Sequence, residues 1–192
     1  MFSPIKTLFT YFPLTFFLRV LFLLAIDVVT AVVLYKRFKK DSLEKSRAIA
    51  IFLLVFYTTI VLFFTVLCRR TLEYYRFGPD MVSYYTALFE GSAEINMIEL
   101  WLNILMFVPI GILSCFVFRK LRMFWAVAIG LCTSLVIELL QLVFRSGFVS
   151  STDFIHNTLG AVLGGLLGIV VILIIKIIGA KSVAKVKKND SV

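Results

Sequence analysis

Histidine, cysteine and charged residues are all scarce in this chain of 192 residues. There is a single histidine, His156, so one chain cannot supply a multi-histidine metal site. The three cysteines, Cys68, Cys115 and Cys132, lack metal-ligand spacing and are most simply small apolar residues. We therefore expect neither a metal nor a cofactor.

Charged residues make up only 16% of the chain and hydrophobic residues 61%, which excludes an ordinary soluble domain. A net charge of +9 would normally suggest nucleic acid as a partner. Here the basic residues fall in short runs beside long apolar stretches, which is typical of a membrane protein that contacts anionic lipid. Membrane lipids are the expected surroundings, and no nucleic-acid partner is expected.

Apolar stretches of about 18 residues or more are long enough to cross a bilayer as helices. Five such stretches are present: 14–35, 48–67, 101–118, 123–144 and 153–178. The sequence therefore predicts an all-α, polytopic transmembrane bundle of about five helices, formed by residues 1–192 as a single membrane domain. The basic tail, residues 179–192, is expected to be disordered.

The first stretch resembles a signal peptide, but we expect it to be retained. It carries Arg19 and Asp27, lacks a small-residue cleavage site, and is followed rather than preceded by a basic block. Arg19 lies near the end of its span, where snorkelling is expected, and Asp27 is expected to pair within the bundle.

Basic residues predict the orientation in the membrane. The loop from Lys36 to Arg47, the turn from Arg119 to Arg122 and the C-terminal tail all fall on one side if five spans alternate. That side is predicted to be the cytoplasm. The N-terminus, the aromatic and acidic segment from Thr71 to Glu99, and the loop from Arg145 to Thr152 are then predicted to be outside.

Polar side chains gather at the predicted outer ends of the last three spans. On the fourth span, Ser134, Glu138, Gln141 and Arg145 follow helical spacing and share one face. Glu138 lies six residues before Phe144, about 9 Å below the outer end. A charge at that depth costs a few kcal/mol unless it is paired, hydrated or protonated.

The third and fifth spans carry polar residues at the same depth in the membrane. Asp153, His156 and Asn157 share one face of the fifth span, and Asn103 lies two residues inside the third span. The sequence therefore predicts one polar pocket, which opens to the outer leaflet or to water. Helix packing is expected to involve residues that allow bending or close approach: Pro109, Gly111, Gly160, Gly164 and Gly168.

Each polar residue also has a simpler interpretation. Asn103 and Gln141 are equally consistent with interhelical hydrogen bonds worth about 1 kcal/mol. Asp153 is consistent with a helix N-cap, and Arg145 with snorkelling at the membrane boundary. His156 alone is more typical of an interfacial histidine than of a catalytic one.

Three motifs in order resemble the VanZ-like family: Asn103-Ile-Leu-Met-Phe-Val-Pro109-Ile-Gly111, Glu138-Leu-Leu-Gln141 before Arg145, and Asp153-Phe-Ile-His156-Asn157-Thr-Leu-Gly160. Arg69, after the second span, also fits the family pattern. Members often carry Asn-Leu-x-Pro-Phe after this arginine, whereas Phe77-Gly78-Pro79-Asp80 stands here. The resemblance implies a bacterial cytoplasmic-membrane protein, and the family's namesake is associated with low-level teicoplanin resistance.

The resemblance also implies that six of the pocket residues have a function: Asn103, Glu138, Gln141, Arg145, Asp153 and Asn157. Arg69 is a further candidate for the same pocket. Three hypotheses follow. The pocket binds a lipid-linked envelope precursor or a lipoglycopeptide, with Arg145 and Arg69 holding a phosphate or carboxylate. Alternatively, Glu138 or Asp153 acts with His156 as acid and base in an intramembrane enzyme that acts on a lipid phosphate or ester. In the third hypothesis, the glycines of the fifth span contact another membrane protein. The oligomeric state is not indicated.

Overall fold

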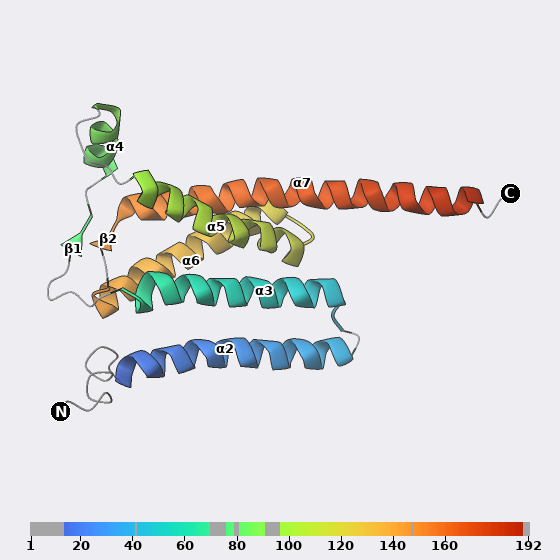
Figure 1. The fold of residues 1–192 in the computed structure, drawn as a ribbon, viewed down its shortest axis with the longest axis horizontal. Helices are drawn as coiled ribbons and strands as arrows, with labels where there is room; N and C mark the ends of the chain where they lie inside the picture. The colour runs from blue at the N-terminus through green and yellow to red at the C-terminus, as the bar shows by residue number, and fades with distance from the viewer. Residues whose placement is uncertain are drawn as a thin grey trace, which may run out of the picture.

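The computed structural model describes residues 14–40, 42–69, 76–78, 81–90, 97–146 and 148–189. These residues form an all-α bundle with one very short pair of parallel strands (Figure 1). The elements are α2 (Leu14–Lys39), α3 (Lys45–Leu62), the π-helical segment η1 (Phe63–Leu67), β1 (Arg76–Phe77), α4 (Met81–Glu90), α5 (Met97–Val117), α6 (Arg122–Phe144), β2 (Phe148–Val149) and α7 (Ser151–Asn189).

Five of the described helical segments are long and apolar enough to cross a membrane. They are Phe16–Lys39, Lys45–Leu67, Leu100–Val117, Arg122–Phe144 and Ser151–Ser182. The predicted fold class and the five predicted spans are thus confirmed. The helices extend a few residues past the predicted apolar limits, because basic residues such as Lys36 and Lys45 continue the helical backbone at the ends of the apolar region.

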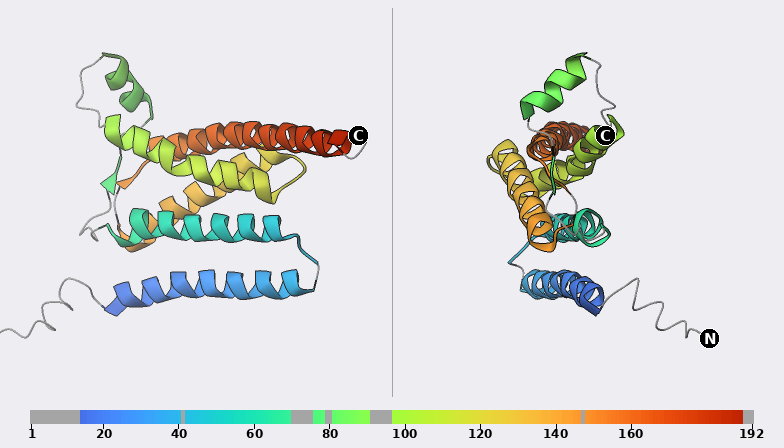
Figure 2. Two further views of the ribbon diagram at one scale, coloured as in Figure 1. Left: turned by 45° about the vertical axis from the view of Figure 1, so that its right-hand side comes forward. Right: turned by 90° about the vertical axis from the view of Figure 1, so that its left-hand side faces the viewer.

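The packed part of the bundle consists of α3, α5, α6 and α7, with α2 at the edge (Figures 1 and 2). Phe107, Ile110 and Ala161 are fully buried at its centre. The outward face of α2 is exposed instead, with Leu21 60% and Phe22 66% accessible. Apolar side chains exposed along a helix of this length are suited to lipid.

Two polar residues of α2 face the bundle. Asp27 is 7% exposed and accepts a hydrogen bond from the Thr59 hydroxyl at 3.1 Å. This bond is a pairing within the bundle of the kind that the sequence predicts. The guanidinium of Arg19 lies 3.9 Å from the centre of the Phe144 ring. Arg19 therefore makes a cation–π contact with α6 in addition to lying near the end of its span.

The glycines of α7 allow α5 to approach its backbone. A Cβ on Gly160 would lie 2.1 Å from the carbonyl oxygen of Ile104, and one on Gly164 would lie 2.0 Å from that of Val108. Gly111 on α5 similarly faces the α7 backbone, and Gly168 faces the α5 turn around Ile112. The predicted glycine stripe thus packs inside the chain, and α5 covers the face that the third hypothesis assigned to another protein.

The two ends of the bundle differ. We call the end where β1 and β2 pair the β-pair end, and the end formed by residues 42–44 and 118–121 the basic end (Figure 1). At the basic end, Arg119 of the α5–α6 turn forms an ion pair with Glu44 of the α2–α3 loop. The spans therefore alternate as predicted, and which end faces the cytoplasm stays a prediction.

The helix α7 is the longest element and extends beyond the other helices at the basic end (Figure 1). Its helix continues to Asn189, through most of the segment expected to be disordered. After Gly179, the residues are mainly Ala, Val and Lys, and none of them is a proline that would end the helix. Several residues of the aromatic and acidic segment from Thr71 to Glu99, among them Glu73, Asp80 and Glu94, lie outside the described residues.

Candidate functional site

A groove opens between α3, η1 and α5 on the half of the bundle nearest the β-pair end. Its volume is about 770 Å³. It is lined by Tyr57, Phe64, Thr65, Arg69, Ile98, Leu102, Asn103, Leu105 and Met106. Most of the wall is apolar, whereas Arg69 and Asn103 bring nitrogen donors to it. Two residues of the predicted polar pocket thus share one groove.

Asn103 is the most unusual residue of this groove. It is 8% exposed, and its amide nitrogen, Nδ2, is buried without a hydrogen-bond partner among the described residues. A buried donor without a partner costs about 1–3 kcal/mol. Because Asn103 lines the groove, a rotation of its side chain would bring this buried nitrogen to an acceptor placed there.

The α5 backbone next to the groove also has altered hydrogen bonding. Pro109 has no N–H, so the carbonyl of Leu105, one turn earlier, lacks its ordinary helical donor. The Tyr57 hydroxyl donates to the neighbouring carbonyl of Met106 at 3.1 Å. This bond fixes α3 against α5 at the wall of the groove.

Glu138 is held at the β-pair end by the loop that follows its own helix. The backbone N–H of Ser150 donates to the Glu138 carboxylate at 3.1 Å. Asp153 and Arg69 both lie within electrostatic range of this carboxylate. Arg69 is thus a residue of the groove wall that also lies within electrostatic range of Glu138.

The loop that holds Glu138 is itself fixed by the strand pair. Parallel pairing of β1 with β2 brings Gly78 against Ser150, where a Cβ on Gly78 would lie 2.8 Å from the Ser150 hydroxyl oxygen. The Ser150 and Thr152 hydroxyls are 2.6 Å apart. The position of the Ser150 N–H thus depends on contacts with a segment that precedes α5 in sequence.

Gln141 bridges α6 to the π-helical segment. Its side-chain amide donates to the backbone carbonyl of Thr65 at 3.0 Å, and Gln141 is 3% exposed. Carbonyls in the last turn of a helix lack intrahelical donors, and Gln141 supplies one. Because Thr65 lines the groove, this bond positions the groove wall.

Asn157 makes the interhelical bond between α6 and α7. Its amide donates to the Ser134 hydroxyl at 2.9 Å, and both residues are buried. Gly130, one turn before Ser134, faces Ala161 so closely that a Cβ there would lie 2.3 Å from the alanine methyl. Asn157 therefore lies in a tight helix contact and has a packing role beside any role in binding.

His156 and Arg145 are placed differently from the other predicted residues. His156 is buried against α4, with its Nε2 3.2 Å from the Tyr85 hydroxyl and its ring near those of Tyr84 and Tyr85. Arg145 is the exposed C-cap of α6, with φ of 52°, and it is not among the residues that line the groove. Left-handed φ is uncommon for an arginine and fits a helix end.

Sequence reasoning did not identify the groove residues of the second span. Thr65 lies four residues before Arg69, which places both near one face of a helix, and this spacing was a usable signal. Tyr57 was a second signal, because a tyrosine inside an apolar span requires a partner for its hydroxyl. The contact between Ser150 and Glu138 had no signal in the sequence, since it depends on the path of a loop.

Comparison with known proteins gives a consistent result. The family model described as VanZ/LLP1 matches residues 22–176. The protein VanZ of Enterococcus faecium is 35% identical over 73 residues, which are 38% of this chain and 45% of that protein. The chain thus matches less than half the length of this relative. No solved structure matches the chain.

Proposed function

This chain belongs to the VanZ/LLP1 family and forms a multi-pass membrane protein, and from that premise we propose that its groove binds the anionic headgroup of an amphiphilic envelope molecule. The headgroup would carry a phosphate or carboxylate. In this proposal the protein lies in the bacterial cytoplasmic membrane, with the β-pair end at the outer face.

The observation that carries the proposal is the amide nitrogen of Asn103, which has no partner among the described residues, at a groove that also contains Arg69. A guanidinium and an amide N–H₂ both donate hydrogen bonds, and a phosphate or carboxylate accepts them. Hydrogen bonds to charged groups contribute about 1.5–3 kcal/mol each. Binding an anion therefore offsets the desolvation of Asn103 and pairs the charge of Arg69.

The rest of the groove is suited to an acyl or prenyl chain. Phe64, Leu102 and Leu105 are exposed on its apolar wall, at 61%, 60% and 60%. Each CH₂ of a ligand that is buried there contributes about 0.8 kcal/mol when the alternative is water. Within a bilayer the ligand's acyl or prenyl chain is already in an apolar environment, so its burial in the groove contributes less free energy. The headgroup contacts would then determine which lipid binds.

We propose, on the family resemblance, a role in the response to glycopeptides such as teicoplanin. A lipoglycopeptide and the lipid-linked precursor that it targets both combine a hydrophobic chain with ionisable groups. We expect one of these two molecules to be the groove's ligand, with Glu138 and Asp153 positioning Arg69.

Native mass spectrometry of the purified protein tests this proposal. Undecaprenyl phosphate, added as the probe, should remain bound to the unaltered chain and to Arg145→Gln. It should be lost from Arg69→Gln and Asn103→Leu, by about tenfold or more if one charged hydrogen bond is removed.

The Arg145→Gln variant is the matched control, because it removes one positive charge at the same end but does not line the groove. Equal loss from Arg69→Gln and Arg145→Gln would show that general positive charge retains the lipid. Retention by all variants would show that the groove is not the binding site.

A further inference from the structure

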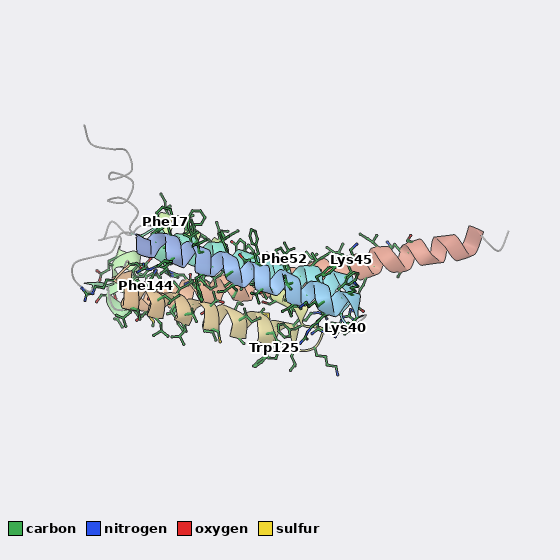
Figure 3. All side chains as sticks on the ribbon, turned by 90° about the horizontal axis from the view of Figure 1, so that it is seen from below. Phe17, Lys40, Lys45, Phe52, Trp125 and Phe144 are labelled. Atoms are coloured by element: carbon green, nitrogen blue, oxygen red, sulfur yellow. The ribbon has the colours of Figure 1, made fainter. Side chains whose placement is uncertain are left out.

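A second cavity lies at the basic end, between α2 and the start of α3, and the proposed function does not use it. Its volume is about 450 Å³. It is lined by Val29, Thr30, Val33, Leu34, Arg37, Ser42, Leu43, Arg47 and Ile51. Lys40 and Lys45, at the same end, are labelled in Figure 3.

Two arginines from different helices line this cavity. Arg47, in the first turn of α3, has a buried Nε that makes no hydrogen bond within the described part of the chain. Arg37, in the last turn of α2, lines the opposite side. Glu44 lies between them in sequence but pairs with Arg119 of the α5–α6 turn. Its carboxylate is thus directed to another cation.

The start of α3 adds further donors. Glu44 is its N-cap residue and makes no side-chain capping hydrogen bond in the described structure. The first N–H groups of a helix have no intrahelical acceptor, and the helix dipole favours an anion there. The cavity is therefore lined by Arg37 and Arg47, and Arg47 stands in the first turn of α3, where the helix dipole also favours an anion.

The walls of the cavity away from the arginines are apolar. Val29, Val33 and Ile51 continue from the arginines along α2 and α3 toward the middle of the bundle. A free phosphate ion would need the donors but not this wall. A phospholipid needs both, because its phosphate lies at the membrane surface and its chains run into the bilayer.

We infer that this cavity binds an anionic phospholipid, with the phosphodiester held by Arg37 and Arg47 and an acyl chain lying against Val29, Val33 and Ile51. The site is separate from the groove at Asn103, at the opposite end of the bundle. Short basic segments at a membrane surface attract anionic lipid in general. In addition to this general attraction, the two arginines that line the cavity form a specific site for the bound lipid.

Competition between lipids tests the inference on the full-length protein. Protein in nanodiscs of equal parts phosphatidylglycerol and phosphatidylcholine is released into the mass spectrometer, and the retained lipid is counted. We expect phosphatidylglycerol to be retained, and Arg37→Gln with Arg47→Gln to lower its retention about tenfold or more.

The matched control is Lys36→Gln with Lys39→Gln, which removes two positive charges from the same end of α2. These lysines do not line the cavity, so retention should change little. Equal losses in the two double variants would overturn the inference, because surface charge alone would explain them. Equal retention of phosphatidylcholine, or displacement of the lipid by inorganic phosphate, would overturn it as well.

The single variant Arg37→Gln distinguishes a binding defect from a folding defect. This variant leaves the partly buried Arg47 in place, and it should still lower phosphatidylglycerol retention. Unchanged retention by a folded Arg37→Gln protein would contradict the inference. Binding of undecaprenyl phosphate at the groove should be unaffected in each variant, so failure of this site does not decide the proposed function.

Discussion

Replacing Gly164 by alanine tests the contact that holds α5 against α7. The Cβ of the new alanine would lie 2.0 Å from the carbonyl oxygen of Val108, and 2.8 and 2.9 Å from its carbonyl carbon and Cα. All three are backbone atoms, so no side chain can rotate away. The two helices must therefore separate by more than an ångström, or one of them must bend.

The expected cost is at the upper end of the range for overpacking, about 3 kcal/mol. That corresponds to roughly a hundredfold change in the unfolding equilibrium. Alanine also has a higher helix propensity than glycine by about 1 kcal/mol, which partly offsets the steric cost. A control with the same chemical change and no steric contact is needed to separate the two effects.

Gly179→Ala is this control. It lies on the same helix, and a Cβ there meets no described atom within 4 Å. Unfolding of both variants in mixed micelles with increasing dodecyl sulfate, followed by circular dichroism, gives the free energies to compare. Gly179→Ala should be as stable as the unaltered chain or slightly more stable. If the free energies of unfolding of Gly164→Ala and Gly179→Ala differ by less than about 0.5 kcal/mol, the close α5–α7 contact is wrong.

Three further predictions concern the polar contacts of the bundle. Gln141→Leu removes the donor to the Thr65 carbonyl and should lower stability by about 1 kcal/mol in the same unfolding assay; an unchanged midpoint would contradict that bond. A double-mutant cycle with Asn157→Ala and Ser134→Ala should give a coupling energy of about 0.6 kcal/mol, and strict additivity would show that the two side chains do not interact. Tyr85→Phe removes the hydroxyl 3.2 Å from the α7 imidazole, so the imidazole nitrogen resonances should move in NMR spectra, whereas unmoved resonances would place α4 elsewhere.

The sequence was sufficient to predict the fold class, because lipid requires long apolar helices and their lengths can be counted. It also predicted that the glycines of α7 form a close helix contact. It could not identify the partner helix, since any of the other spans can approach a small-residue face. The structure assigns α5, through the contact of Gly164 with Val108.

The candidate site was predicted in part. Helical spacing and chain direction predicted that Glu138 and Asp153 share one end of the bundle, and the family resemblance had indicated Arg69; in the structure Asp153 and Arg69 both lie within electrostatic range of Glu138. Spacing could not show which polar side chains are already satisfied. The amide nitrogen of Gln141 donates to a backbone carbonyl, and only its Oε1 lacks a partner among the described residues, whereas the amide nitrogen of Asn103 has no partner there. That difference arises from the packing of helices distant in sequence.

In the proposed function, an anionic amphiphile binds between α3 and α5, with its headgroup at Arg69 and Asn103. Photo-crosslinking measures this most directly, with an undecaprenyl phosphate analogue that carries a diazirine near its phosphate and with adducts mapped by peptide mass spectrometry. We expect adducts on Phe64, Ile98 and Leu102, which line the groove, and their loss in Arg69→Gln. Adducts spread evenly over the exposed apolar faces of α2 and α7, and unchanged in Arg69→Gln, would contradict it.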